Sequence, residues 1–483
     1  MNIRELLIKL YFCSLFVPLL NGIQQFNASS FLDQSFGNNG IVTTDFGMHS
    51  GTFNRYAASI HVKIQPDKKI IVVGDAYRNH TYDESKVGII NHPESNFALA
   101  RYNSDGSLDN SFGVDGKVIL PLSKVDSFGI DLALQDDGKI VVVGRNFDRG
   151  DYYPDAIMVR LNQDGTLDNS FGIGGIVHEN NLENEVSQFW RVALQDDGKI
   201  IAVGSKGAYK QEYIFDYNSF FIARYTVDGT PDVSFGDNGK IETRLKVSNF
   251  AKSRVEGRED DYTNGLCLQS DGKILAVGAV ADASTLDLLS NIYNADCALV
   301  RYEQSGKLDA TFGQDKNGMI VTSASKQDNH FMDVVVQPDE KIVAIAIARN
   351  SATEKDEFLI ARYLADGTLD ASFGENQNGL VLTSLGTDHA HAKNVLLQKD
   401  GKILVTGNVT WGSHTKFTLV RYTQDGILDK TFGQDGIIIT FVGDGDDKSF
   451  AMAMQDDGKL VIAGNSFDGA QYNFALVRYN IQD

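Results

Sequence analysis

Apolar residues along this chain fall into short runs that are separated by clusters of glycine, aspartate and asparagine. Runs such as KIVVVG and AIMVRL are apolar throughout, whereas a strand with one solvated face alternates apolar and polar positions. Continuous apolar runs of this length are typical of strands that are covered on both faces. The pattern therefore predicts an all-β protein built from short strands in stacked sheets.

Three phrases recur along the chain, each of them seven times. The first begins as FLDQSFG at Phe31, and its last phenylalanine stands at Phe36, Phe112, Phe171, Phe235, Phe312, Phe373 and Phe432. The second joins a glutamine to a DGKI-like turn and an apolar stretch, as in QDDGKIVVVG. The third resembles FALARY and ends at Arg101, Arg160, Arg224, Arg301, Arg362, Arg421 and Arg478. Equal counts indicate repeated copies of one structural unit.

Each unit supplies four strand candidates, a to d in chain order, such as IDLALQ, KIVVVG, AIMVRL and the stretch after SFG. The Asp-Gly between a and b predicts a type I′ hairpin turn, whose two central residues both need positive φ. Turn chemistry also separates c from d. Seven units of four strands favour a seven-bladed β-propeller of antiparallel blades over a parallel β-helix or a sandwich.

The two ends of the chain complement each other. The chain begins with an LDxSFG phrase and a strand d, and it stops just after a strand c, so the last unit lacks its own strand d. We expect residues 40–44 to pair with the last sheet, because this closes the ring and removes an open sheet edge.

The LDxSFG, DGKIxVxG and FALARY phrases together resemble the delta-60 repeat of bacterial proteins and, more distantly, the NHL propeller repeat. The resemblance extends from about Phe31 to the C-terminus, with departures at Lys68, Glu340, Leu161 and after KIVAIA. It implies a propeller-like fold and a bacterial source. It supplies no single activity and no catalytic residue.

The first 22 residues have the features of a Sec-type signal peptide. Arg4 and Lys9 precede an apolar run from Leu10 to Leu20, which is shorter than the roughly 20 residues of a membrane span. Residues 23–483 then form one propeller domain, with no transmembrane segment after cleavage. We expect a secreted protein, extracellular or periplasmic.

The net charge argues against one class of partner, and the positions of the cysteines argue against a disulfide. A formal charge of −20 repels phosphate backbones and argues against nucleic acid as a partner. Cys267 falls in a strand a and Cys297 in a strand c of one unit, with a strand b between them. Two strand spacings of about 4.8 Å exceed the roughly 7 Å that a disulfide spans, so we expect free buried thiols.

The sequence differs most between units at one end of the predicted ring. This end is formed by the b–c and d–a connections, and we call it the variable face. Insertions fall there at 75–96, 205–219, 245–263 and 279–296. Its aromatic residues stack on sugars, anchor a protein partner or pack the loops themselves. The candidates for binding are Tyr82, Tyr153, Tyr213, Tyr217 and Trp411. Most histidines also fall there, but a metal site has only the weak pair His389 and His391 in its favour.

A second candidate site comes from the residue four before the glutamine that ends each strand a. If strand a is innermost, this position lies near the axis of the ring on the side of the variable face, where a central pocket would form. The residue there is polar in most units and differs between them, which suits either an asymmetric ligand or a solvated channel wall. Its candidate ligand-binding residues are His61, Asp131, Arg191, Asp333 and Asn394. The repeated DGxLD aspartates offer calcium ligands, but seven copies favour structural Asx turns, and the repeated arginines favour structural bonds.

The sequence therefore favours a binding or scaffold protein that presents its variable face to a protein or a glycan. The alternative is a propeller-type hydrolase or lyase, with His61, Asp131 and Asp333 as acid/base candidates and Arg191 holding an anionic group. No nucleophile motif is present, so we assign no catalytic residue. We expect no cofactor, no metal and a monomer.

Overall fold

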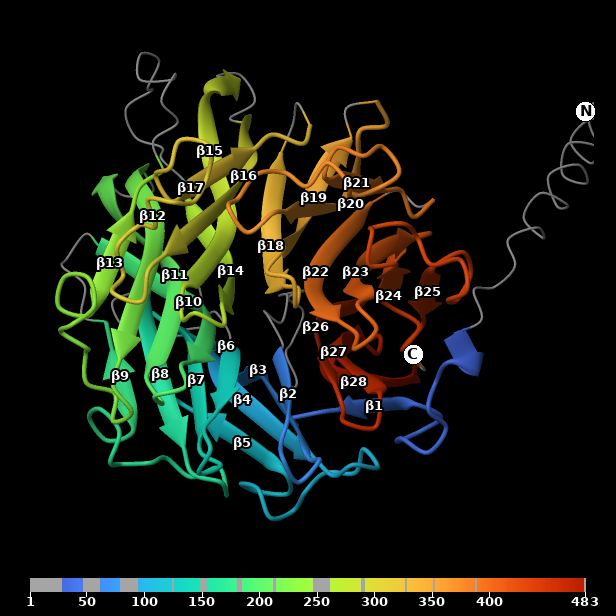
Figure 1. Cartoon of the computed structure of the whole chain (residues 1–483). Helices are drawn as coiled ribbons and strands as arrows, with labels where there is room; N and C mark the ends of the chain where they lie inside the picture. The colour runs from blue at the N-terminus through green and yellow to red at the C-terminus, as the bar shows by residue number, and fades with distance from the viewer. Residues whose placement is uncertain are drawn as a thin grey trace, which may run out of the picture.

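The chain folds into seven four-stranded antiparallel sheets arranged as blades around a common axis, which confirms the predicted seven-bladed β-propeller (Figure 1). The computed structural model describes residues 28–46, 61–78, 94–123, 126–147, 154–179, 185–211, 214–245, 261–287, 292–325, 328–350, 352–386 and 389–481. Within these residues, no helix is long and apolar enough to cross a membrane.

The blades follow chain order. Blade 1 contains β2 (His61–Ile64), β3 (Ile70–Arg78), β4 (Glu94–Tyr102) and β5 (Lys117–Leu120), and blade 2 contains β6 (Ser127–Leu134), β7 (Ile140–Asn146), β8 (Asp155–Leu161) and β9 (Ile176–His178). Blade 3 contains β10 (Glu185–Leu194), β11 (Ile200–Gln211), β12 (Ile214–Tyr225) and β13 (Lys240–Thr243), and blade 4 contains β14 (Tyr262–Leu268), β15 (Ile274–Asp287), β16 (Ile292–Tyr302) and β17 (Met319–Thr322). Blade 5 contains β18 (Asn329–Val336), β19 (Ile342–Asn350), β20 (Lys355–Tyr363) and β21 (Leu380–Thr383), and blade 6 contains β22 (Ala390–Leu397), β23 (Ile403–Trp411), β24 (His414–Tyr422) and β25 (Ile437–Thr440). Blade 7 contains β26 (Asp447–Met454), β27 (Lys459–Phe467), β28 (Tyr472–Asn480) and β1 (Ile41–Thr44), and a short 3₁₀ turn, η1 (Ala28–Ser30), precedes β1.

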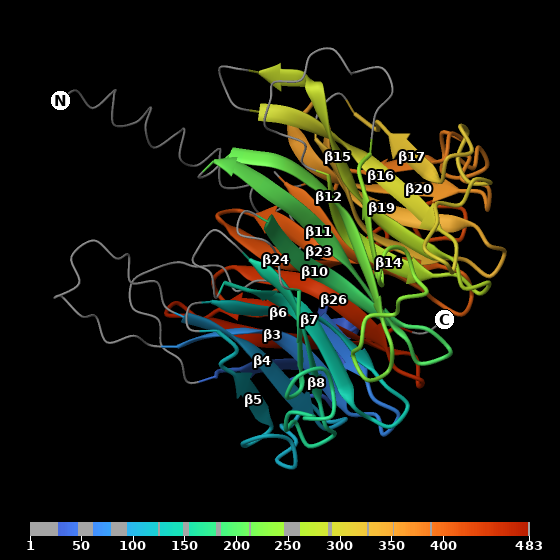
Figure 2. The same ribbon diagram turned by 90° about the vertical axis from the view of Figure 1, so that its left-hand side faces the viewer.

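The first strand of every blade is innermost. In Figure 1 the strands β2, β6, β10, β14, β18, β22 and β26 surround the centre of the ring. The side view shows the hairpins β11–β12 and β15–β16 projecting from one end, and these hairpins contain the insertions 205–219 and 279–296 (Figure 2). The insertions 75–96 and 245–263 lie partly outside the described residues. The variable face is thus the end from which the long hairpins project.

The N-terminal strand closes the ring as predicted. Strand β1 pairs antiparallel with β28, with Ile41 opposite Val477 and Thr44 opposite Phe474, and the two strands lie side by side in blue and red in Figure 1. The backbone N–H of Asn480 also donates to the carbonyl of Phe31 at 2.7 Å. The last sheet therefore has a partner on the edge that its own unit leaves open.

The hydrophobic core is divided among the seams, by which we mean the interfaces between adjacent blades. In one seam Ile71 and Phe97 of blade 1 pack in one cluster with Leu132 and Val142 of blade 2. Each of these side chains is fully or almost fully buried. Both faces of each sheet are covered in this way, which explains the unbroken apolar runs.

The predicted type I′ turn between the first two strands of each blade is wrong. In blade 2 the N–H of Gly138 donates to the carbonyl of Gln135 at 2.8 Å, and Gly138 has φ +79° whereas the preceding Asp137 has a negative φ. Only one residue needs the left-handed region, as in a three-residue loop with a bulge. Lys68 (φ +68°) and Glu340 (φ +65°) occupy that position in blades 1 and 5, at a cost of about 1 kcal/mol each.

The two cysteines are free, as predicted. Cys267 lies in β14 and Cys297 in β16, with β15 paired between them. Burial raises the pKa of the Cys267 thiol to about 11, which keeps it protonated and unreactive at neutral pH.

Candidate functional site

The repeated arginines join each blade to the next. In blade 5 the Arg362 Nε donates to the Asp370 carboxylate at 2.9 Å, and its Nη1 donates to the carbonyl of Gln424 in blade 6 at 2.6 Å. Its guanidinium also lies 4.4 Å from the centre of the Phe373 ring. The equivalent ion pairs are Arg101–Asp109, Arg160–Asp168, Arg224–Asp232, Arg301–Asp309, Arg421–Asp429 and Arg478–Asp33. These arginines are structural.

The DGxLD aspartates form turns. Asp366 Oδ1 accepts hydrogen bonds from the backbone N–H and hydroxyl of Thr368, at 2.9 and 2.8 Å, and Asp370 Oδ1 accepts the same two bonds from Ser372. Burial disfavours the charged form, but the bonds from Ser372 and the Arg362 charge lower the pKa of Asp370 to about 2. Both oxygens of Asp370 therefore have partners within the protein, in agreement with the turn interpretation.

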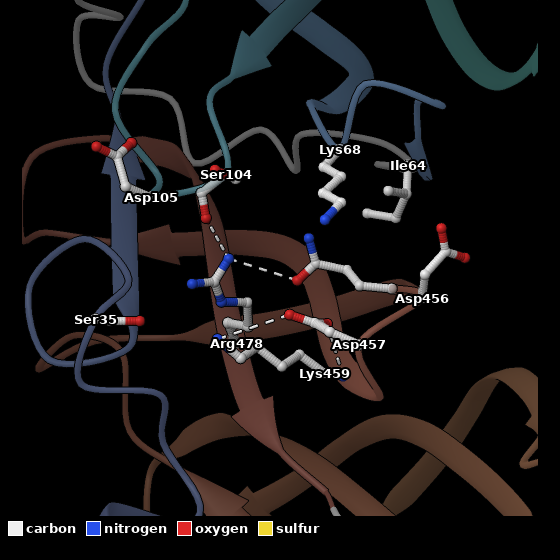
Figure 3. A pocket seen from close by; sticks show the side chains of 10 residues that line it. Ser35, Ile64, Lys68, Ser104, Asp105, Asp456, Asp457, Lys459 and Arg478 are labelled. Atoms are coloured by element: carbon white, nitrogen blue, oxygen red, sulfur yellow. Dashed lines mark hydrogen bonds and ion pairs between the residues drawn. The ribbon is translucent and has the colours of Figure 1, made fainter.

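A pocket of about 400 Å³ lies where blades 7 and 1 meet, at the end of the ring opposite the variable face. Figure 3 shows Arg478 reaching Ser104 across this seam, while Lys68 points into the pocket from blade 1. In blade 2 the position of Ser104 is Gln163, whose side-chain amide donates to the carbonyl of Asp137 at 2.6 Å and covers the turn. Serine is too short for this contact, so Ser104 leaves the turn of blade 1 uncovered at the edge of the pocket.

Charged side chains that line this pocket form the ion pairs of the repeat. Its Lys459 lies 3.0 Å from Asp33 and 3.8 Å from Asp457, and Arg478 is bonded to Asp33 at 2.8 Å. The same Lys–Asp and Arg–Asp ion pairs recur in the other blades. The charges of this pocket hold the ring closed, and we do not assign it a ligand.

The structure brings His61 and Asp131 together and places Asp131 in a seam. His61 Nδ1 lies 3.0 Å from Asp131 Oδ1, and Asp131 Oδ2 accepts the backbone N–H of Val192 in the next blade at 2.9 Å. Burial lowers the pKa of His61 despite its carboxylate neighbour. Burial also opposes the ionisation of Asp131, but His61 and Arg191 hold its pKa below the usual range.

Asp333 and Asn394 form a second chain of bonds between blades 5, 6 and 7. The Asn394 amide donates to Asp333 Oδ2, which also accepts the N–H of Val395 at 3.0 Å. Asn394 Oδ1 in turn accepts the N–H of Met452 at 2.9 Å. Burial raises the pKa of Asp333. Both side chains therefore link neighbouring inner strands and are almost fully buried.

A β-bulge in the inner strands explains this placement. The pairing register shifts just before the candidate position in β6, β10, β14, β18, β22 and β26, for example between Ala392 and Asn394. A bulge inserts one extra residue and redirects the side chains around it. Asp131, Asp333 and Asn394 at the candidate position turn into the seams. Arg191 at the same position in β10, and the bulged residue Lys393 in β22, stay partly accessible.

We call the bulged residue and the residue two before it in each inner strand the mouth positions, because they lie toward the variable face. The described mouth positions are Phe128, Ile130, Gln188, Trp190, Tyr262, Asn264, His330, Met332, His391, Lys393, Lys448 and Phe450, and all but Ile130 are partly accessible to solvent. The sequence reading missed them because the glutamine alignment does not show where a bulge shifts the alternation of the strand.

Among the five aromatic binding candidates, Trp411 is the one whose side chain the structure describes. Tyr82, Tyr153 and Tyr213 lie outside the described residues, and Tyr217 lies in β12, opposite Ala208. Trp411 ends β23, and its ring meets that of Phe441 edge-on with centroids 6.2 Å apart.

The loop that carries Phe441 is built around a lysine. Lys416 is 3% exposed, and its ammonium donates to the carbonyls of Gly443 and Gly445 and to Asp447 Oδ2, at 2.8, 2.7 and 2.9 Å. All three N–H bonds of the ammonium are satisfied. The loop thus holds Phe441, 45% exposed, in a fixed place beside Trp411.

The adjacent histidines His389 and His391 both contact one carboxylate. His389 Nδ1 lies 3.0 Å and His391 Nε2 lies 3.1 Å from Asp356 Oδ2. The hydrogen bond from His391 is the main cause that lowers the pKa of Asp356. Within the part of the chain that the structure describes, no group of three or more His, Cys, Asp or Glu side chains is arranged to hold a metal ion.

The fold and the repeated seam bonds define a β-propeller repeat protein. A family model described as "Domain of unknown function (DUF5122) beta-propeller" matches residues 92–112, 135–171, 195–235, 337–373, 398–432 and 455–480, so the chain is similar to that family. No curated protein matches the sequence.

Solved structures with a similar fold share little sequence with this chain. A protein of unknown function from Dyadobacter fermentans DSM 18053 is 13% identical, with 73% of this chain and 94% of that chain covered and a TM-score of 0.43. The polysaccharide lyase Uly1 is 12% identical, with 91% and 94% covered and a TM-score of 0.47. The β-propeller domain of the Trilobed protease from Pyrococcus furiosus is 11% identical, with 89% and 95% covered and a TM-score of 0.40.

Proposed function

We propose that this protein is a secreted binding protein, released by its signal peptide and built from delta-60 repeats, that recognises a glycan or protein partner through its variable face. The observation that carries the proposal is that the two ends of the ring differ: one end repeats the same structural bonds, and the other varies in sequence. The repeated arginines and aspartates bond to each other within the protein, as Arg362 does to Asp370. The sequence of the variable face, in contrast, differs from blade to blade. Binding residues on a rigid scaffold gather where the sequence is individual.

The Trp411–Phe441 pair supports this proposal. Aromatic rings supply large contact areas to sugars and to protein partners. The bonds of Lys416 to Gly443 and Gly445 hold the loop before any partner arrives, so little conformational entropy is lost on binding. A preformed, exposed aromatic surface of this kind suits recognition.

The hydrolase or lyase alternative receives less support. A general acid or base must reach the substrate proton within hydrogen-bonding distance. Asp131 and Asp333 instead accept backbone N–H groups of Val192 and Val395 in neighbouring blades. Their carboxylates are buried in the seams and are already engaged by the protein.

The test compares the two ends of the ring. Glycan-array and pull-down binding of the secreted protein identifies a partner, and the double variant Trp411→Ala/Phe441→Ala should weaken its binding by about tenfold or more. The matched control is Ile173→Ala, which truncates an 89% exposed apolar side chain at the opposite end. The proposal fails if Ile173→Ala abolishes binding while the double variant binds like the wild type. Turnover of the partner by the wild type would favour the enzyme alternative.

A further inference from the structure

The mouth positions of the inner strands contain no acidic residue in the part of the chain that the structure describes. The whole chain has 64 aspartates and glutamates against 44 lysines and arginines, so an acid-free lining stands out from its composition. Lys393 and Lys448 occupy mouth positions, and Arg191 follows the bulge of β10 directly. The described mouth positions therefore carry only basic or uncharged side chains, while the carboxylates of Asp131 and Asp333 lie buried in the seams.

Two of these cations form no direct ion pair, although the charge of Arg191 acts over a longer distance on the buried carboxylates of Asp131 and Asp333. Arg191 and Lys393 are partly buried, and neither forms an ion pair with a described carboxylate. Arg191 Nη1 donates to the carbonyl of Trp190 in its own strand at 2.8 Å, and its Nε is buried without a partner. The lysines of the repeat behave differently, since Lys341, for example, lies 3.3 Å from Asp370.

Arg191 and Lys393 come from blades on nearly opposite sides of the seven-bladed ring. Arg191 belongs to β10 in blade 3 and Lys393 to β22 in blade 6, and both strands border the centre in Figure 1. Burial lowers the pKa of Lys393 to about 8, and the charges of Arg191 and Lys448 add to this effect. A bound anion would reverse it, because an opposite charge nearby favours the ammonium form.

The other mouth residues suit a sugar. Tyr262, stacked on His330, and Trp190, beside the Arg145 guanidinium, place aromatic rings there. Gln188 Oε1 accepts from Arg145 and Asn264 Nδ2 donates to the Phe331 carbonyl, so the opposite end of each amide is the part that can meet a hydroxyl group. The Trp190 indole N–H is buried without a partner. We propose that the mouth of the ring binds an acidic saccharide whose carboxylate or sulfate group is held between Arg191 and Lys393. This deepens the proposed binding function and rests on it.

The test uses the full secreted protein and isothermal titration calorimetry at low salt. The probes are tetragalacturonate and a chondroitin sulfate tetrasaccharide, with cellotetraose as the neutral saccharide and hexaglutamate as the acidic peptide. An acidic tetrasaccharide should bind, and Lys393→Gln and Arg191→Gln should each weaken it tenfold or more. The matched control, Lys307→Gln, removes the same charge from an exposed turn at the opposite end and should stay within about twofold.

The pH dependence provides a second readout. The affinity of the wild type should fall up to about tenfold between pH 7 and pH 9, because Lys393 loses its proton, and Lys393→Gln should lose this dependence. Thermal melts show whether each variant folds. Equal affinity for cellotetraose, wild-type affinity in both folded variants, or binding of hexaglutamate alone overturns the proposal. A partner that needs Trp411 and Phe441 but no anion leaves the proposed function standing and removes only the mouth site.

Discussion

Replacing Asp33 with alanine should open the ring at its closure. Asp33 Oδ2 accepts a hydrogen bond from Arg478 Nε at 2.8 Å, and it lies 2.8 Å from Arg478 Nη2 and 3.0 Å from Lys459 Nζ. The arginine side chain is 4% exposed, so the variant leaves a buried charge without its partner. Removing one partner of a buried ion pair costs about 3–5 kcal/mol. At about 1.4 kcal/mol per tenfold, the opening equilibrium of this seam rises by a factor between about 10² and about 4 × 10³.

Native-state hydrogen exchange with mass spectrometry locates the effect. In Asp33→Ala the amides of β1 and β28 should exchange at least about a hundredfold faster than in the wild type, because these strands separate when the closure opens. The matched control is Asp370→Ala, which breaks the equivalent Arg362–Asp370 pair inside blade 5. Asp370→Ala should lower the free energy of unfolding by a similar amount. It should leave the hydrogen-exchange protection of β1 and β28 at the wild-type level.

The reasoning is refuted by either of two results. If β1 and β28 keep wild-type protection in Asp33→Ala, the ion pair does not hold the closure. If Asp370→Ala exposes β1 and β28 as strongly as Asp33→Ala does, the ring opens as one cooperative unit, and the closure is no weaker point than any other seam.

Three further changes test individual contacts, each by urea unfolding. The folded pKa of Asp370, about 2, lies below its ordinary value of 3.8, so its contribution is complete above about pH 4 and is lost as the pH falls through 2. The difference in unfolding free energy between wild type and Asp370→Asn should therefore narrow by about 2 kcal/mol from pH 7 to pH 2, and an unchanged difference contradicts the shift. Gly144→Ala should cost about 1–3 kcal/mol, because the added Cβ meets a backbone carbonyl of β6 at 1.9 Å. Lys416→Met should cost about 3–5 kcal/mol, because the buried Asp447 carboxylate loses its counter-charge and keeps only the neutral donors of Val442, Gly443 and Ser466. An unfolding midpoint equal to that of the wild type would show that the ammonium does not organise its loop.

The sequence by itself determined the number of blades, the order of their strands and the closure. Residues 40–44 could be matched to the last sheet because a missing strand at one end and a spare strand at the other are visible in the repeat. The separation of Cys267 from Cys297 followed from the same strand order. These features depend on local periodicity, which each unit repeats independently of its neighbours.

Tertiary structure alone decided which side chains face the centre. Asp131 was a natural candidate for a central pocket, but the bulge before it turns its carboxylate into the seam, where it meets the N–H of Val192. The same kind of bulge leaves Lys393, which no alignment of the glutamines singled out, partly accessible at the mouth. A bulge changes the direction of side chains without changing the type of any residue. Contacts between blades also join segments far apart in the chain, so their partners are known only once the ring has formed.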